Sequence, residues 1–243
     1  MPRRAGAFII VGMNRPLARF AARRRWLRAA LALPLAFPMP LSAQTHPQAG
    51  ALLRAARDGD LAAVKQALAA GVPIESRDAD GRTPLLLATH GNRLSVVLWL
   101  IERGADVNAQ DKQRDSAFLL AGARGYTEIV RAALRAGADL ASTNRYGGTA
   151  LIPACHYGHV ETVRLLLSTN IDVDHVNQLG WTALLEAVIL GDGGPAHQQI
   201  VRLLLGHGAQ PNLADRDGVT PLRHAQRRGH AEIAALLRAA GGR

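Results

Sequence analysis

One phrase recurs at a fixed spacing along most of this chain of 243 residues. Two of its columns are a Thr or Ser and, five residues later, an Ala; both return every 33 residues, with a single step of 38. These columns are Thr83, Ser116, Thr149, Thr182 and Thr220, then Ala88, Ala121, Ala154, Ala187 and Ala225. Columns that shift together through the longer step indicate tandem copies of one structural unit. A period of this size predicts a solenoid, in which each unit buries its apolar face against its neighbours.

The columns have a physical interpretation as a pair of helices joined by turns. The hydroxyl residues precede apolar runs, as helix N-caps do, and Pro84 and Pro221 follow two of them at the first helical position. The alanines indicate places where helices approach closely. A glycine or asparagine column predicts left-handed residues that end the second helix, and an Asp/Asn column predicts tight turns. Those two columns are Gly71, Gly104, Gly137, Asn170 and Gly208, then Asp78, Asp111, Asn144, Asn177 and Asp215.

In these phrases the chain resembles the ankyrin repeat family. The resemblance is carried by Asp80-Gly81-Arg82-Thr83-Pro84-Leu85, Gly104-Ala105-Asp106-Val107-Asn108 and Asp217-Gly218-Val219-Thr220-Pro221-Leu222. It covers about residues 49–241 and implies an all-α repeat solenoid of stacked helix-turn-helix units, with β-hairpin loops along one edge. Six units are expected, at 49–78 (an N-terminal cap), 79–111, 112–144, 145–177, 178–215 (with a five-residue insertion) and 216–241 (a C-terminal cap). The family's histidine after Thr-Pro-Leu is replaced by aliphatic residues, which we expect to pack against the next unit: Leu86, Leu119, Ile152 and Leu185.

Residues 1–43 have a different composition and predict an export signal. They hold eight arginines and no acidic residue, and Arg23-Arg24-Arg25 precedes a short apolar run that ends at Ser42-Ala43-Gln44. A basic region, a short apolar core and small residues at a cleavage site are typical of signal peptides. Twin-arginine and general secretory export both fit. The alternative is an uncleaved membrane anchor, against which stand three prolines and a run shorter than the roughly 20 residues that span a bilayer.

Removal of this segment changes the meaning of the overall charge. The whole chain carries +10, from 29 basic and 19 acidic residues. Cleavage after residue 43 removes eight basic and no acidic residues, which leaves +2. Such a charge does not predict nucleic-acid binding, which needs a basic surface. Few lysines and many arginines and alanines are typical of a GC-rich bacterial genome. Because a bacterial protein with an export signal leaves the cytoplasm, we expect a periplasmic or secreted protein.

The strongest candidate for chemistry is the cluster Cys155, His156 and His159. A thiol next to two imidazoles suggests a nucleophile or a metal site, and an envelope enzyme or metal-dependent protein is the alternative function. No third ligand or base is specified by the spacing, and His159 belongs to the repeat phrase, since His230 follows the corresponding Gly229. The sequence therefore predicts neither an enzyme nor a cofactor.

A partner-binding surface is expected on the concave face formed by the first helices. Positions four, seven and eight after each cap should point into it, and they include Leu87, Leu120, Tyr157, Glu186, Ile189 and Leu190. Apolar residues gathered on an exposed face are typical of protein-binding sites. The other interpretation, that these residues belong to the core, stays open because a helix phase shifted by one position would bury them.

Loop tips offer a second set of partner-binding candidates. Arg145 and Tyr146 lie at one tip, and Trp181 stands just before the cap of the fifth unit. Aromatic and arginine side chains often anchor interfaces, although packing within the repeat would also explain Trp181. We therefore predict a non-enzymatic protein-interaction scaffold of the bacterial cell envelope. It would be monomeric, bind an unidentified protein, and bind neither nucleic acid nor, after cleavage, membrane. A membrane-anchored adaptor that keeps its N-terminal segment is the remaining alternative.

Overall fold

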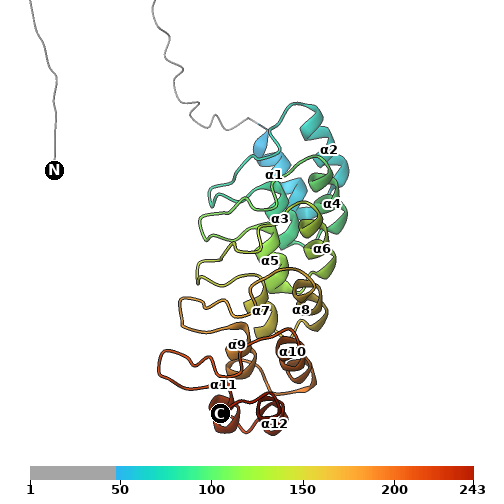
Figure 1. The fold of residues 1–243 in the computed structure, drawn as a ribbon. Helices are drawn as coiled ribbons and strands as arrows, with labels where there is room; N and C mark the ends of the chain where they lie inside the picture. Colours follow the sequence, from blue (N-terminus) through green and yellow to red (C-terminus); the bar gives the residue numbers. More distant parts are fainter. Residues whose placement is uncertain (1–47) are drawn as a thin grey trace, which may run out of the picture. The chain divides into compact units, whose positions relative to one another are not determined.

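The computed structural model describes residues 48–243, and in this part of the chain it holds twelve α-helices that follow one another in pairs (Figure 1). The first helices of the pairs, here called inner, are α1 (Ala49–Asp58), α3 (Pro84–His90), α5 (Ala117–Arg124), α7 (Leu151–His156), α9 (Ala183–Ile189) and α11 (Pro221–Arg227). The second, outer helices are α2 (Leu61–Ala69), α4 (Leu94–Glu102), α6 (Thr127–Arg135), α8 (Val160–Leu167), α10 (Pro195–Gly206) and α12 (Ala231–Ala239). The predicted export segment, residues 1–43, lies outside the described residues. Among the described helices, none has the length and apolar character needed to cross a bilayer.

The helices form two layers, and each helix packs on its counterparts in the neighbouring pairs. Every inner helix contacts the next inner helix along the chain, from α1 to α11, and every outer helix contacts the next outer one, from α2 to α12. Each inner helix also packs on its own outer helix. Loops project from one side of this stack (Figure 1). The predicted α-solenoid of helix-turn-helix units is therefore confirmed.

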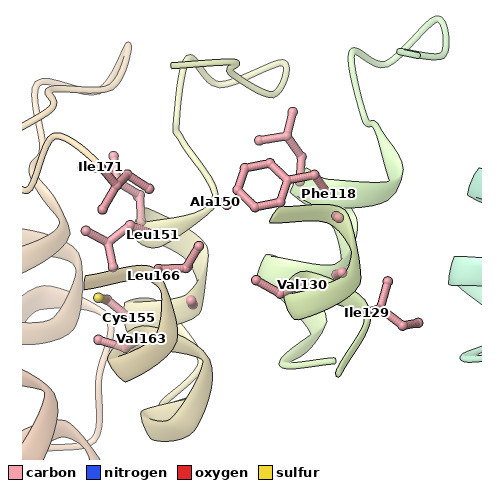
Figure 2. Close-up of a cluster of buried hydrophobic side chains, with 14 of the residues drawn as sticks. Phe118, Ile129, Val130, Ala150, Leu151, Cys155, Val163, Leu166 and Ile171 are labelled. Atoms are coloured by element: carbon pink, nitrogen blue, oxygen red, sulfur yellow. The ribbon is translucent and has the colours of Figure 1, made fainter. Parts of the chain in front are cut away.

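A continuous core runs between the two layers. All five alanines of the alanine column are fully buried, and so are the six aliphatic residues that recur on the outer helices, Val64, Val97, Val130, Val163, Val201 and Ile233. Figure 2 shows part of this core, with Phe118 and Val130 from one unit and Leu151 and Leu166 from the next. The four aliphatic residues that replace the family histidine are at most 3% exposed, as expected for residues that pack against the next unit.

The hydroxyl column caps the inner helices at four of its five positions. Thr83, Ser116, Thr182 and Thr220 each accept a hydrogen bond from the backbone N–H three residues later. The prediction is wrong for Thr149, because α7 begins at Leu151 and the Thr149 hydroxyl has no partner among the described residues. In the other units the residue four after the cap donates its N–H to the cap's carbonyl. Pro153 occupies that position here and has no N–H, so the turn tightens to a bond from Ile152 N–H to the Thr149 carbonyl, at 3.3 Å.

The glycine column ends the outer helices as predicted, with one exception. Gly71, Gly104, Gly137 and Gly208 all have φ between +83° and +87°. Asn170 is not in the left-handed region, so the prediction made for it is wrong. Two hydroxyls take over its role at the end of α8: Ser168 Oγ donates to the Leu165 carbonyl and Thr169 Oγ1 to the Leu166 carbonyl, both at 2.6 Å.

The projecting loops are reverse turns rather than paired strands. In each of the five complete loops the Asp or Asn of its column accepts two backbone N–H groups through Oδ1, as Asp78 does from Asp80 and Arg82. One pair of backbone bonds closes each turn, for example Gly81 N–H to Asp78 O and Asp78 N–H to Arg82 O. No strand occurs in residues 48–243, so the expected β-hairpins are limited to their turns. Side-chain bonds to the backbone make these turns rigid supports for the residues at their tips.

The five-residue insertion lengthens an outer helix instead of forming only a loop. Helix α10 begins at Pro195, with Gly194 as its N-cap, and has 12 residues, whereas the other outer helices have eight or nine. Asp192 Oδ1 accepts from Gly194 N–H and lies 2.8 Å from His197 Nδ1. The other ring nitrogen of His197 lies 2.9 Å from the His156 carbonyl, which ties the insertion to the preceding unit.

Candidate functional site

The inner helices and loop tips enclose a groove of about 940 Å³, the central groove. It extends from the end of α3 to α9 and includes the loops that lead into α5, α7 and α9. Its wall contains both apolar and titratable side chains. Among these are Leu120, Arg145, Tyr146, His156, Tyr157, Leu179, Glu186 and Leu190.

Six of the nine predicted binding residues line this groove: Leu120, Arg145, Tyr146, Tyr157, Glu186 and Leu190. The other three, Leu87, Trp181 and Ile189, are absent from its lining. Leu87 and Leu120 are only 5% and 7% exposed, so the core interpretation is correct for these two positions. Residues four positions after the cap are buried in three units, whereas Tyr157 and Leu190, just after the ends of α7 and α9, are exposed. Whether the nine residues bind a partner stays a prediction.

Two residues from each of two consecutive units form an exposed apolar surface, the central patch, defined as Tyr146, Tyr157, Leu179 and Leu190. Their exposed fractions are 55%, 60%, 49% and 41%. Tyr146 and Leu179 lie 33 residues apart at adjacent loop tips, joined by a 2.9 Å bond from Gln178 N–H to the Tyr146 carbonyl. Tyr157 and Leu190 are also 33 apart and follow the last residues of α7 and α9. Repetition thus places one pair at the loop tips and one pair at the helix ends, and both pairs line the central groove.

Both tyrosines of the central patch are held in place by polar neighbours. The Tyr157 ring stacks on the His156 imidazole, with centroids 4.2 Å apart and planes 11° apart. The Arg145 guanidinium lies 5.1 Å from the Tyr146 ring centroid, donates to Gln113 Oε1, and is 3.9 Å from Asp115 Oδ2. Rigid aromatic side chains with exposed faces lose little conformational entropy when a partner binds.

Glu186 is a buried carboxyl group in the wall of the groove. Its Oε1 accepts from Asn177 Nδ2 at 2.9 Å, and its Oε2 is 3.6 Å from His156 Nδ1. Burial raises the pKa of Glu186 to about 7, an effect that the Asn177 hydrogen bond partly opposes. Burial also lowers the pKa of His156, aided by nearby His197, so this imidazole is a weak countercharge at neutral pH.

The side chains of Cys155, His156 and His159 lie in different surroundings rather than around one common site. Cys155 is fully buried, and burial raises the pKa of its thiol well above the ordinary value, which disfavours the nucleophilic thiolate. The His159 ring packs against Gly125 of the preceding unit, while His156 faces Glu186 and Tyr157. Within residues 48–243 no group of three or more His, Cys, Asp or Glu side chains is arranged to hold a metal ion.

Sequence reasoning did not identify several residues that line the groove, among them Asp115, Tyr126 and Asn177. Asn177 belongs to the Asp/Asn column and was therefore interpreted only as a turn residue. Its side-chain amide also donates a hydrogen bond to Glu186. The signal that does single out this place is a break in the pattern. The equivalent positions are Leu87, Leu120, Pro153 and His224, so Glu186 is the acidic residue in this column.

The raised pKa of Glu186 gives a testable dependence of stability on pH. The ordinary pKa of 4.5 holds in the unfolded chain, and the folded value is about 7. As pH rises from about 4.5, the unfolded chain loses this proton first, so wild type should lose free energy of unfolding until about pH 7. The total loss is about 3 kcal/mol, at about 1.4 kcal/mol per pKa unit. In Glu186→Gln the amide oxygen still accepts from Asn177 and nothing titrates, so this loss should be absent.

Urea unfolding at pH 5 and pH 8 measures the effect as the difference between the two proteins. Glu161→Gln, which changes an exposed carboxylate on α8, is the control and should leave the pH profile of wild type intact. If the free energies of unfolding of wild type and Glu186→Gln differ by the same amount at both pH values, the raised pKa assigned to Glu186 is wrong.

Comparison with known proteins gives matches along the repeats. The profile described as ankyrin repeats (3 copies) matches residues 41–111, 118–215 and 172–242. The putative ankyrin repeat protein YahD of Escherichia coli (strain K12) is 59% identical over 56 residues. Those residues make up 23% of this chain and 28% of YahD, so the match spans less than a third of that relative.

Solved structures share the fold over most of the chain. An ankyrin repeat domain from Acinetobacter baumannii AYE is 56% identical, with a TM-score of 0.76 over 79% of this chain and 98% of that one. The ankyrin repeat protein EF0377 is 42% identical, with a TM-score of 0.75 over 78% and 97%. The ankyrin repeat domain of Bcl-3, a member of the IκB protein family, is 31% identical, with a TM-score of 0.70 over 79% and 86%. The chain therefore belongs to the ankyrin repeat family, whose repeats generally mediate protein–protein interactions.

Proposed function

We propose that this protein is a non-enzymatic scaffold that binds a segment of another protein in the central groove. The observation that carries the proposal is the central patch, four large apolar side chains that are 41–60% exposed and line one groove. Exposing such residues together is unfavourable in water, and contiguous apolar patches with polar surroundings are typical of protein-binding surfaces.

The geometry of the groove supports this role. The tyrosines are held by Arg145 and His156 before any partner binds, and the turns that carry Tyr146 and Leu179 are fixed by Asn144 and Asn177. A surface that is already ordered loses less conformational entropy on binding. Tyrosine and arginine are also enriched among the residues that contribute most to interface affinity.

The proposed place of action is the bacterial cell envelope, with the protein acting as a monomer after export. Support comes from the basic, acid-free composition of residues 1–43 and from the apolar run that follows Arg23-Arg24-Arg25. The charge of +2 that remains after cleavage is compatible with a protein partner and gives no basic surface for nucleic acid.

The groove is tested by capture of a partner from envelope extract, followed by affinity measurement with the captured protein. Replacing Tyr146, Tyr157 and Leu190 together with alanine should weaken binding at least about tenfold, since each removes exposed anchoring area. In the matched control, alanine replaces three other exposed residues, Leu94, Val176 and Leu213. These are 36–53% exposed and lie outside the groove. Equal binding by both triple variants, each with native helical content, would place the site elsewhere.

Export is tested by the mass of the protein recovered from a bacterial host. The signal hypothesis predicts an N-terminus at or near Gln44, in the periplasmic fraction. Recovery of the intact chain from the membrane fraction would favour the anchored adaptor, and recovery of the intact chain from the cytoplasm would contradict both.

A further inference from the structure

The carboxyl group of Glu186 lacks a cation of its own, although it lines the groove. Its side chain is 8% exposed, and only Oε1 has a hydrogen-bond donor among the described residues, the neutral amide of Asn177. The other oxygen has His156 Nδ1 at 3.6 Å, beyond hydrogen-bonding distance. A buried carboxylate without a paired cation carries a large desolvation penalty.

The neighbouring unit shows how the repeat satisfies a polar residue at this position. His224 of α11 is the counterpart of Glu186, and it pairs with Asp215 through a 2.7 Å contact between Nε2 and Oδ2. Asp215 is in turn the counterpart of Asn177. In the last unit the His224 imidazole is therefore paired with a carboxylate, whereas in the fifth unit the Glu186 carboxyl group is paired with an amide. The Asp215 carboxylate thus has a ring nitrogen at 2.7 Å, whereas the donor to the Glu186 carboxyl group is the neutral Asn177 amide.

The surroundings of Glu186 suit a long basic side chain. Leu190 and Tyr157 of the central patch line the same groove and offer apolar surface to an alkyl stem. The Tyr146 ring already has a guanidinium 5.1 Å from its centroid, that of Arg145, so cations and aromatic rings meet in this groove. Arg145 itself is engaged by Gln113 and lies near Asp115, which offsets its charge.

We infer that the central groove recognises a lysine or arginine side chain of its protein partner, and that Glu186 accepts hydrogen bonds from the charged head. The inference rests on the proposed function, because it specifies what the groove selects in a partner. The ammonium or guanidinium would supply the charge that Asn177 and His156 do not, while the patch contacts apolar residues beside it. Leucine at the same position in the second and third units provides no such selectivity.

Binding should also respond to pH in a defined direction. A cation prefers the ionised carboxylate, and with a pKa of about 7 the ionised fraction of Glu186 grows about tenfold between pH 6 and pH 8. Affinity for a basic peptide should therefore rise by up to about tenfold over that range. The helices packed against α9 carry several other titratable or charged groups: Cys155 and His156 on α7, His197 (with Asp192) and Arg202 on α10, and Arg223, His224 (with Asp215) and Arg227 on α11. Comparison of wild type with Glu186→Gln removes their contributions.

The test uses a random 12-residue peptide library displayed on phage and selected on the full chain. Selected peptides are first sorted by loss of binding to the Tyr146, Tyr157 and Leu190 triple alanine variant. For those that depend on the groove, each basic residue is then replaced by an uncharged analogue, norleucine for lysine or citrulline for arginine.

We expect one basic position whose replacement weakens binding at least about tenfold, and a similar loss in Glu186→Gln. The two changes should not add, because both remove the same contact. Glu186→Leu, which places the residue of Leu87 and Leu120 in the fifth unit, is the second variant and should fold and lose the same selectivity. Glu161→Gln should bind like wild type.

Groove-dependent peptides that lack a basic residue, or that bind Glu186→Gln unchanged, would overturn this inference and leave the proposed function standing. Selection of acidic peptides that depend on Arg145 would overturn it in the same way. If no selected peptide depends on the groove, both the inference and the assignment of the groove are wrong.

Discussion

The structure depends on burial of apolar surface between neighbouring units. Each pair of helices contributes one fully buried alanine and one fully buried aliphatic residue, such as Ala121 and Val130, to a core shared with the pairs beside it. No unit is large enough to bury such a face alone, so folding and stacking are the same process. This constraint favours one unit length, which is visible in the sequence as a period of 33 residues with a single step of 38.

The stack also determines where a binding site can form. Residues 33 apart are brought to equivalent places in consecutive units, so two positions of the repeat suffice to build the four-residue central patch. Residues that maintain the stack cannot vary without loss of packing, whereas those at loop tips and helix ends can. The groove therefore takes its chemistry from departures from the repeat, of which Glu186 is the clearest.

Much of the fold was predictable because it follows from local rules. Caps such as Thr83 and left-handed glycines such as Gly104 satisfy backbone groups that any helix leaves free. The two exceptions, Thr149 and Asn170, depend on the particular residues around them: Pro153 removes a backbone donor, and Thr169 supplies a hydroxyl that replaces a backbone turn. Neither effect can be read from the cap column or the glycine column alone, because Pro153 and Thr169 lie outside those columns.

The site was less predictable, because exposure depends on how neighbouring helices meet. Leu87 and Tyr157 were both expected on the concave face, yet one is buried and the other is 60% exposed. Their distance from the cap differs by only four positions, and the sequence does not specify the tilt of each inner helix against the next. The burial of Glu186, and with it the pKa of about 7, likewise requires the positions of α7 and α9 to be known.

A partner bound in the central groove should protect the backbone amides of the groove from solvent. Hydrogen–deuterium exchange of the full chain, with and without its captured partner, measures this protection. Slower exchange is expected in the loops around residues 144–148 and 177–181 and at the C-terminal ends of α7 and α9. Slower exchange confined to the outer helices α4, α6 and α8, with the groove unchanged, would contradict binding in the groove.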